Sequence, residues 1–390
     1  MKRYKDLVKK YAQKTHLDKI ITPLITSRII LQIVGYLSLI FLPNPNYPLY
    51  KGNDWFFIPE RFLDIWARWD TGWYYTIVTE GYSPNLDIQN NMSNIAFFPL
   101  YPLLIKVSSL FAIDFSTYRT LFVIFGLFVS NISFIIALFF SYKIMEFFKF
   151  SNTTKETVIW LVVLYPYSFF FSSVYSESVF LLFLVLTFYF CLKSNWLFAS
   201  IAGALLTLTR PLGILVILPI GIRYFYVNNY KIKLMDLLYF SLIPVALGLF
   251  FLHSYFVTGD FFGSINNQLA WGKVIQMPWK TIFSPNYRRP IINDFDLAFT
   301  IIALILLIYN YFLRLPNPEW TFYSLALIIS PLFYGVLQSN GRYSSVAISI
   351  YFSLGMLIEK NQTLRLPIYI GFAMIQAVLF AGWVRGYFIV

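Results

Sequence analysis

Asp70 is the residue of this sequence whose setting points most clearly to chemistry. It lies between Trp69 and Trp73 in a polar, aromatic stretch of an otherwise apolar chain. A carboxylate between tryptophans is partly desolvated, which raises its basicity and suits a general base that takes a proton from a hydroxyl. Residues 66–81 repeat at intervals of three and four, which predicts a helix whose tryptophans lie at a membrane interface. The competing interpretation is that Asp70 caps a helix beginning at Thr71.

Glu177 and Arg210 place two more charges within apolar sequence. A carboxylate in a membrane is costly unless it is paired or hydrated, so Glu177 is a candidate substrate-binding residue. Its alternative is a helix start capped by Ser176, with Glu177 favoured by the helix dipole. The planar guanidinium of Arg210 suits a phosphate, and its alternatives are a snorkelling arginine or a structural partner of Glu177.

Two further polar segments carry candidate ligand contacts. Arg342 follows a polar turn and offers a second contact to a phosphate, while Gln338 in the same turn offers a hydrogen bond to a sugar or phosphate. Gln268 and Trp271 combine an amide with an aromatic surface, a pairing suited to sugars. The alternatives are an arginine among lipid headgroups for Arg342 and ordinary loop packing for the Gln268 segment.

Membrane helices must hold these residues in place. The chain is 58% hydrophobic and 12% charged, whereas soluble domains carry about 25% charged residues. Apolar runs of about 18 residues recur throughout, so we expect an all-α polytopic membrane protein. About eleven spans are predicted, at 20–42, 118–142, 156–172, 174–192, 196–209, 212–226, 236–257, 297–314, 320–338, 342–358 and 366–385. The largest polar insert, 43–117, is predicted to be the first extracytoplasmic loop, with interfacial helices that include a short one at 97–113.

The net charge of +12 is unevenly distributed. Seven basic residues precede position 20, which predicts a cytoplasmic N-terminal segment at 1–19 and a single integral-membrane domain at 20–390. This distribution favours a membrane surface over nucleic acid as the partner of the positive charge. Arg28, early in the first span, is expected to snorkel to the cytoplasmic interface. When the predicted spans are alternated across the membrane from a cytoplasmic N-terminus, one face carries four of the candidate residues. Asp70, Glu177, Arg210 and Arg342 are then expected together on the extracytoplasmic face of a plasma-membrane protein.

Several chemistries lack their usual residues. No glycine-rich phosphate loop follows a strand, which argues against a nucleotide-sugar donor in a Rossmann domain. Cys191 is the single cysteine and there are two histidines, so no transition-metal cluster is predicted. We predict no cofactor with certainty, and a divalent cation held by Asp70, Asp64 or Glu177 stays an open alternative.

In this order, the polar motifs resemble the GPI mannosyltransferase II family and its prokaryotic relatives, within the GT-C superfamily of integral-membrane glycosyltransferases. The matching segments are Trp69-Asp70-Thr71-Gly72-Trp73-Tyr74 with Ile77 and Gly81-Tyr82, Phe97-Phe98-Pro99-Leu100-Tyr101-Pro102, Tyr175-Ser176-Glu177-Ser178, Thr209-Arg210-Pro211-Leu212-Gly213, Thr258-Gly259-Asp260 with Gln268 and Trp271-Gly272, and Gln338 with Arg342-Tyr343.

The resemblance implies a GT-C-type bundle and a polyprenyl-phosphate sugar as donor, most often of mannose. It implies an inverting single displacement on the extracytoplasmic face, in which Asp70 deprotonates an acceptor hydroxyl of a glycan or glycolipid. We expect the acceptor to approach over Trp69 and Trp73, and the donor phosphate to lie near Arg210 and Arg342. The segment Ile77-Val78-Thr79 and Pro211 depart from the family pattern, which leaves the acceptor open.

Two other functions also use polar groups in a membrane protein. A lipid or polysaccharide transporter usually has its polar site near the midplane, on broken helices and often in repeated halves. The polar motifs here are expected at one membrane face, and no internal repeat is evident. A glycan ligase or polymerase that depends on a lipid diphosphate would share the extracytoplasmic site and differ in its donor.

Overall fold

The computed structural model describes residues 16–43, 56–84, 92–268, 273–283, 290–313, 318–335, 337, 339–387 and 389. Within these ranges the chain forms helices and no β-strand, as expected for an all-α protein. Most of the predicted basic segment, with Trp271 and Gln338, lies outside the described residues.

Five helices are long and apolar enough to cross a membrane among the residues described. They are α2 (Asp18–Phe41), α6 (Arg119–Phe147), α11 (Leu234–Thr258), α14 (Pro290–Leu313) and α18 (Arg365–Val384). A helix satisfies its own backbone hydrogen bonds in lipid, which explains why runs of this composition adopt it. These helices mark the chain as a membrane protein.

Shorter helices occupy the remaining predicted spans. They have 11 to 16 residues and are α7 (Asn152–Leu164), α8 (Glu177–Leu192), α9 (Trp196–Thr209), α10 (Ile217–Val227), α15 (Pro318–Ile329) and α17 (Ile348–Lys360). A straight helix needs about 20 residues to cross the hydrocarbon layer. The prediction therefore located the helices, while a smaller number than expected reach spanning length.

The first large loop folds into short helices. These are α3 (Arg61–Asp64), α4 (Thr71–Thr79), the 3₁₀ helix η1 (Asn94–Ala96) and α5 (Leu100–Ser108). The nine residues of α5 agree with the short helix expected at 97–113. The helix predicted from residue 66 begins only at Thr71, because Trp69 has a φ of 50° and interrupts the helical backbone.

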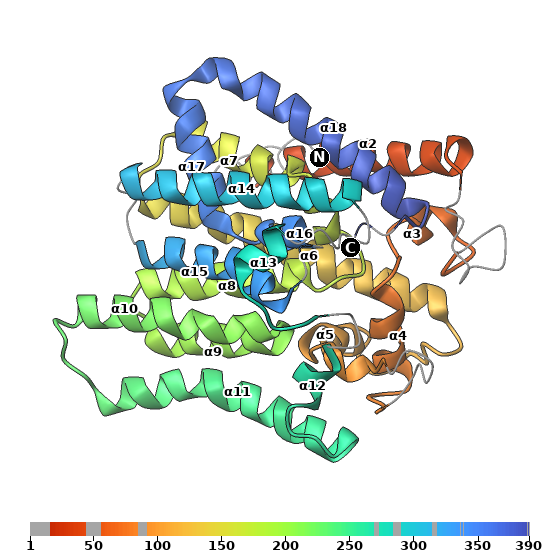
Figure 1. Ribbon diagram of the computed structural model, residues 1–390, viewed down its shortest axis with the longest axis horizontal. Coiled ribbons are helices and arrows are strands. Elements are labelled where there is room, and N and C mark those ends of the chain that lie inside the picture. The colour runs from red at the N-terminus through yellow and green to blue at the C-terminus, as the bar shows by residue number, and fades with distance from the viewer. Residues whose placement is uncertain are drawn as a thin grey trace, which may run out of the picture.

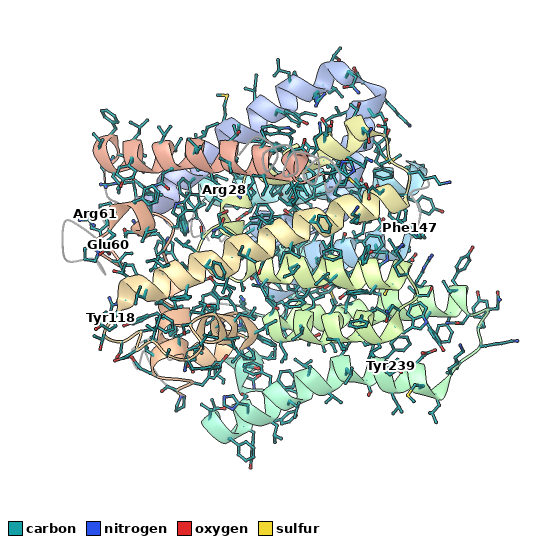
Figure 2. The ribbon with its side chains drawn as sticks, turned by 180° about the vertical axis from the view of Figure 1, so that it is seen from behind. Arg28, Glu60, Arg61, Tyr118, Phe147 and Tyr239 are labelled. Atoms are coloured by element: carbon teal, nitrogen blue, oxygen red, sulfur yellow. The ribbon has the colours of Figure 1, made fainter. Side chains whose placement is uncertain are left out.

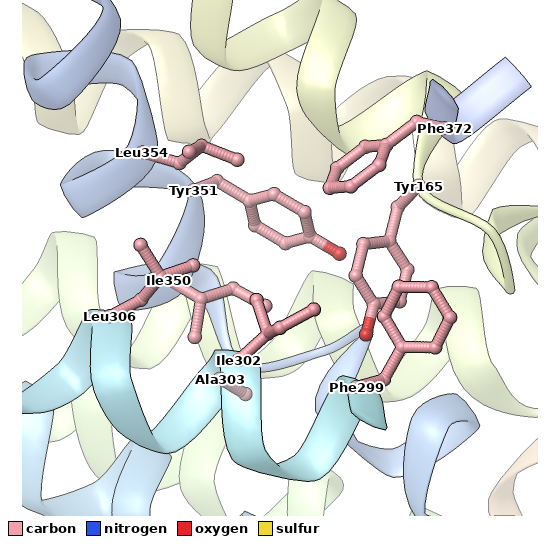
Figure 3. A pocket seen from close by; sticks show the side chains of 9 residues that line it. All are labelled: Tyr165, Phe299, Ile302, Ala303, Leu306, Ile350, Tyr351, Leu354 and Phe372. Carbon is pink, nitrogen blue, oxygen red and sulfur yellow. The ribbon is translucent and has the colours of Figure 1, made fainter. Parts of the chain in front are cut away.

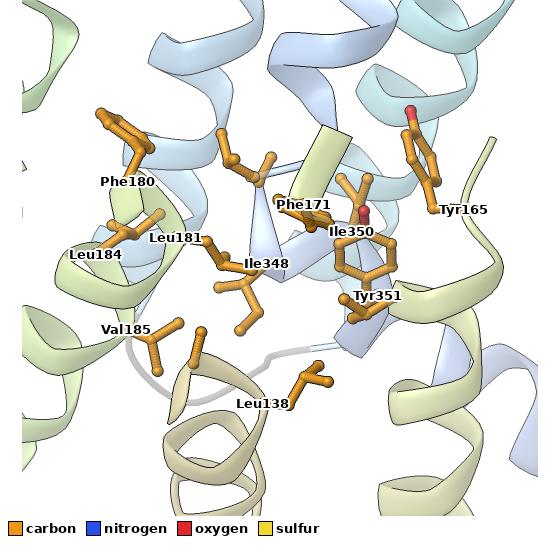
Figure 4. Packing of buried hydrophobic residues seen from close by; sticks show 14 of the residues in the cluster. Leu138, Tyr165, Phe171, Phe180, Leu181, Leu184, Val185, Ile348, Ile350 and Tyr351 are labelled. Atoms are coloured by element: carbon orange, nitrogen blue, oxygen red, sulfur yellow. The ribbon is translucent and has the colours of Figure 1, made fainter. Parts of the chain in front are cut away.

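The core lies around α8, which packs between α6 and α9 (Figure 1). Leu181, Leu184 and Val185 of α8 belong to one buried cluster with Leu138 of α6 and Ile348 of α17 (Figure 4). By contrast, α2 and α18 lie together at one side of the bundle and α11 at the opposite side. These outer helices expose large apolar side chains, which suits contact with lipid.

Arg28 does not snorkel to an interface, contrary to the expectation. Its Nε donates to Ser172 Oγ at 2.6 Å and its Nη2 to the carbonyl oxygen of Ser168 at 2.8 Å. Figure 2 shows the residue on α2 where that helix faces the bundle. The irregular segment between α7 and α8 has carbonyl and hydroxyl groups that need donors, and Arg28 supplies them.

Candidate active site

Four charged side chains form one chain of ion pairs. Arg342, on the short helix α16 (Asn340–Ser344), has Nη1 and Nη2 each 3.1 Å from Oδ2 of Asp70. Its Nε donates to Oε1 of Glu177, and Nη2 of Arg210 donates to the same oxygen. The charges therefore alternate in the order Asp70, Arg342, Glu177 and Arg210. The structure brings these four predicted residues together, although they lie in four separate segments of the chain.

Asp70 precedes α4, but its side chain makes no capping hydrogen bond. Its backbone is helical, with φ −58° and ψ −19°, whereas a capping residue needs an extended backbone to turn its carboxylate toward the first amides. The capping interpretation is therefore wrong. The backbone N–H of Asp70 donates to Tyr175 Oη at 3.1 Å, and the carboxylate, 19% exposed, points to Arg342. The acid is thus both held in place and accessible.

Glu177 is fully buried at the first position of α8. Among the described residues its Oε2 is buried without a hydrogen-bond partner, while Oε1 serves both arginines. Ser176 does not cap the helix, contrary to the alternative reading. Its hydroxyl accepts from Arg210 Nε at 3.1 Å and from Tyr74 Oη at 3.0 Å. Glu177 therefore orients the two arginines side by side, which establishes the structural pairing expected as an alternative for Arg210.

The turn that carries Arg342 is held by a buried carboxylate on α14. Oδ1 of Asp296 accepts from Tyr167 Oη at 2.8 Å and from the N–H of Gly341 at 2.9 Å. Its Oδ2 accepts from the N–H of Ser339 at 2.9 Å, where the backbone is left-handed with a φ of 70°. A Cβ on Gly341 would lie 2.6 Å from Tyr167 Cζ, so only glycine fits. Arg342 is itself 5% exposed, which overturns its alternative reading as a headgroup arginine.

Sequence reasoning assigned Asp296 no part in the site. The available signal was an acid directly before the predicted span 297–314, because an acid at a membrane helix marks a candidate functional position.

Lys273 adds a third positive charge that sequence reasoning did not select. Its Nζ donates to Oε1 of Gln268, whose Nε2 donates to the carbonyl oxygen of Ala96 at 3.1 Å. Burial raises the pKa of the Tyr343 phenol, but the charges of Lys273, Arg210 and Arg342 outweigh it and lower that pKa below its usual value. Three cations therefore act on one ring, and Arg210 lies 5.5 Å from its centroid.

The remaining predicted site residues have other contacts. Trp73 stacks on Phe97 with ring centroids 5.8 Å apart, and Trp69 packs against the main core. Both are half-buried and flank Asp70 in the sequence, and the approach of an acceptor over them stays a prediction.

The carboxylates considered for a divalent cation do not share one site. Asp64 is paired with Arg68 at 2.7 Å, whereas Asp70 and Glu177 meet at Arg342. No group of three or more His, Cys, Asp and Glu side chains in the described part of the chain could hold a metal ion.

A separate apolar cavity lies between α14, α17 and α18. Its lining carries no charged side chain and includes Tyr165, Phe299, Tyr351 and Phe372 (Figure 3). Tyr165 Oη is 2.6 Å from Ser344 Oγ, on the helix that bears Arg342. The cavity thus borders the helix of the charged site and is not the site itself.

Comparison with known proteins assigns no relative. A scan of family models and a search of curated proteins find no match to this chain. The function must therefore be argued from the site itself.

Proposed function

We propose that this protein is a glycosyltransferase that moves a hexose, most often mannose, from a polyprenyl phosphate to an acceptor hydroxyl. The observation that carries the proposal is the contact of Asp70 with Arg342, which shares Glu177 with Arg210. A candidate base thereby lies beside two cations fit to bind a phosphate. The resemblance to GT-C mannosyltransferases gives Asp70 the role of the base.

The proposed reaction is a single displacement. Asp70 takes the proton of the acceptor hydroxyl, whose oxygen forms a bond to the anomeric carbon of the donor sugar. The bond from that carbon to the phosphate oxygen breaks with inversion, and polyprenyl phosphate leaves with the electron pair. Arg210, Arg342 and Lys273 stabilise the negative charge that grows on the leaving phosphate, an electrostatic contribution that is usually large.

The ion pair between Asp70 and Arg342 implies an order of events. In the free protein Oδ2 of Asp70 is occupied by both terminal nitrogens of Arg342, so this oxygen is not open to an acceptor hydroxyl. A donor phosphate that contacts Arg342 competes with Asp70 for the guanidinium. Donor binding then frees Oδ2 for the acceptor, so the base becomes active only when a donor is present.

The chain of four charges lies where the long helices of the bundle begin or end, which favours a transferase over a transporter. Asp70 precedes α4, Glu177 begins α8, Arg210 follows α9, and Arg342 lies on the five-residue helix α16 shortly before α17. A transporter site usually lies near the midplane on broken helices. We propose that this end of the bundle faces outward across the plasma membrane, with about eleven crossings and a cytoplasmic N-terminus.

The decisive experiment supplies the purified protein in vesicles with radiolabelled polyprenyl-phosphate mannose and a glycolipid extract. The expected result is covalent transfer of label to a glycan or glycolipid. Movement of the donor across the vesicle without transfer would favour the transporter. Transfer from a lipid-diphosphate sugar, with none from the monophosphate, would favour the ligase or polymerase.

A further inference from the structure

A second cluster of arginines lies where α3 meets the ends of α2 and α18. At its centre is the buried pair of Asp64 and Arg68. Asp64 Oδ1 also accepts from the backbone N–H groups of Phe57 at 2.7 Å and Ile58 at 2.9 Å. Arg68 Nε donates to the carbonyl oxygen of Val384 at 3.0 Å, at the end of α18. This pair connects the first loop to the C-terminal helix, with Oδ2 of Asp64 in the ion pair and Oδ1 on the loop backbone.

Two more arginines face the same pair without a carboxylate of their own. Burial lowers the pKa of Arg68, Asp64 opposes that effect, and the positive charges of Arg61 and Arg385 lower the pKa further. In the described ranges of the chain, Arg61 and Arg385 form no ion pair. Among the described residues, three guanidinium groups therefore act around one buried acid, which leaves positive charge in excess of the buried carboxylate.

Arg61 and Arg385 each have a hydrogen-bond donor that is unused among the described residues. Arg61 Nη1 and Arg385 Nε are both buried atoms without a hydrogen-bond partner among the described residues. Arg61 lies over the ring of Phe56, and Arg385 Nη1 reaches the carbonyl oxygen of Leu39 at 3.4 Å. A buried N–H of a charged group that stays unpaired costs free energy, so these donors point to a missing acceptor. A snorkelling arginine would instead extend its nitrogens into water.

The surface next to the cluster is apolar. At the end of α2, Ile40 and Phe41 are 69% and 75% exposed, and on α18 Met374 and Val378 also face outward. Figure 1 shows the two helices converging toward α3, and Figure 2 shows Arg61 beside the end of α2. A ligand here would meet cations at the helix ends and hydrocarbon along the helices.

We propose that Arg61 and Arg385 bind the phosphate of an anionic membrane lipid whose acyl chains lie along α2 and α18. Two guanidinium groups offer paired donors in the geometry that phosphate oxygens accept. The site is separate from Arg210 and Arg342 and does not depend on the proposed transfer reaction. The bound lipid would fasten the base-bearing loop, because Arg68 lies two positions before Asp70 and contacts the same cluster.

The test measures lipid binding to the full-length protein without any sugar donor. The protein is purified in neutral detergent, short-chain phosphatidylglycerol is added, and bound lipid is counted by native mass spectrometry. The double variant Arg61→Gln/Arg385→Gln should bind it at least about tenfold more weakly than the wild type, because two charge-assisted contacts are lost. The double lysine variant should retain most of the binding, since it keeps both charges.

Arg119→Gln is the matched control. Arg119 is an exposed arginine at the start of α6 that lies over Tyr75, with its guanidinium 4.7 Å from the ring centroid. This variant should bind phosphatidylglycerol as the wild type does. If it weakens binding as much as the double glutamine variant, net charge explains the effect and the site is wrong. The single glutamine variants provide the same comparison if the double variant does not fold.

Two further probes separate the source of the phosphate. Inorganic phosphate and neutral phosphatidylcholine should each leave the bound phosphatidylglycerol unchanged at equal concentration. Full displacement by inorganic phosphate would mean that the arginines bind a soluble anion, which would overturn the lipid assignment. Equal retention of phosphatidylglycerol by the wild type and the double glutamine variant would overturn it as well.

Discussion

Both terminal nitrogens of Arg342 lie 3.1 Å from a single carboxylate oxygen of Asp70, although the two residues are 272 positions apart. The same guanidinium donates through Nε to Glu177, which is fully buried. Asp70 is the partly exposed end of this chain of charges, and Glu177 is its buried centre. The two acids should therefore respond differently to neutral substitution.

The substitution Asp70→Asn should abolish sugar transfer and leave the fold and donor binding largely intact. A positioned base contributes about 10²- to 10⁴-fold to a rate, and asparagine cannot accept the proton. The measurement is label transfer from polyprenyl-phosphate mannose, with donor binding measured separately. Glu80→Gln is the control, because Glu80 is an exposed acid at the end of the same helix, α4. Near-normal turnover by the Asp70→Asn protein would end the assignment of the base.

The substitution Glu177→Gln should destabilise the protein more than any change at Asp70. A glutamine leaves Arg342 and Arg210 close together without the carboxylate they share. Removing one partner of a buried ion pair costs about 3–5 kcal/mol. Unfolding by denaturant in mixed micelles measures the loss, with Asp70→Asn as the comparison. Equal stability of the two variants would contradict the central role of Glu177.

The sequence predicted the members of the charged site better than their geometry. Alternating the apolar runs across a membrane was enough to expect Asp70, Glu177, Arg210 and Arg342 on one face. Residue types and hydropathy cannot report a backbone angle, however. The φ of Trp69 decides that the helix begins only at Thr71, and the helical backbone of Asp70 itself explains why its carboxylate does not cap that helix.

The sequence pattern could not predict contacts between segments that are distant in the chain. The role of Asp296 depends on the turn at Ser339 and Gly341 folding back onto α14, more than 40 positions away. The role of Lys273 depends on its loop lying near Tyr343. Neither residue spacing nor composition predicts these contacts, because they follow from how the helices pack.

The substitution Asp296→Asn should loosen the turn that carries Arg342. The side-chain NH₂ of asparagine cannot accept the N–H of Ser339, so at least one of the three hydrogen bonds to this carboxylate is lost. We expect a loss of stability of about 1–3 kcal/mol and weaker donor binding. Asp294→Asn is the matched control, since Asp294 is exposed two positions earlier on α14. Equal effects of the two substitutions would remove Asp296 from the site.

The phenol of Tyr343 should ionise below the usual tyrosine pKa of about 10. Burial alone would raise its pKa, but Lys273, Arg210 and Arg342 favour the phenolate and lower it. The folded pKa therefore lies below the unfolded one. The stability gained from the phenolate is complete above the unfolded pKa and is lost as the pH falls through the lower folded pKa.

An alkaline titration followed by ultraviolet difference absorbance, wild type minus Tyr343→Phe, isolates this single phenol. Lys273→Gln should move its midpoint upward, because Lys273 is the largest of the charges that lower the pKa. Lys280→Gln is the control, since it removes a lysine from the same connecting segment between α11 and α14 that is not among the main charges acting on Tyr343. If the titration midpoint of Tyr343 is the same in the Lys273→Gln protein as in the wild type, Lys273 lies away from the cationic site. It would then be removed from the proposed contacts to the donor phosphate.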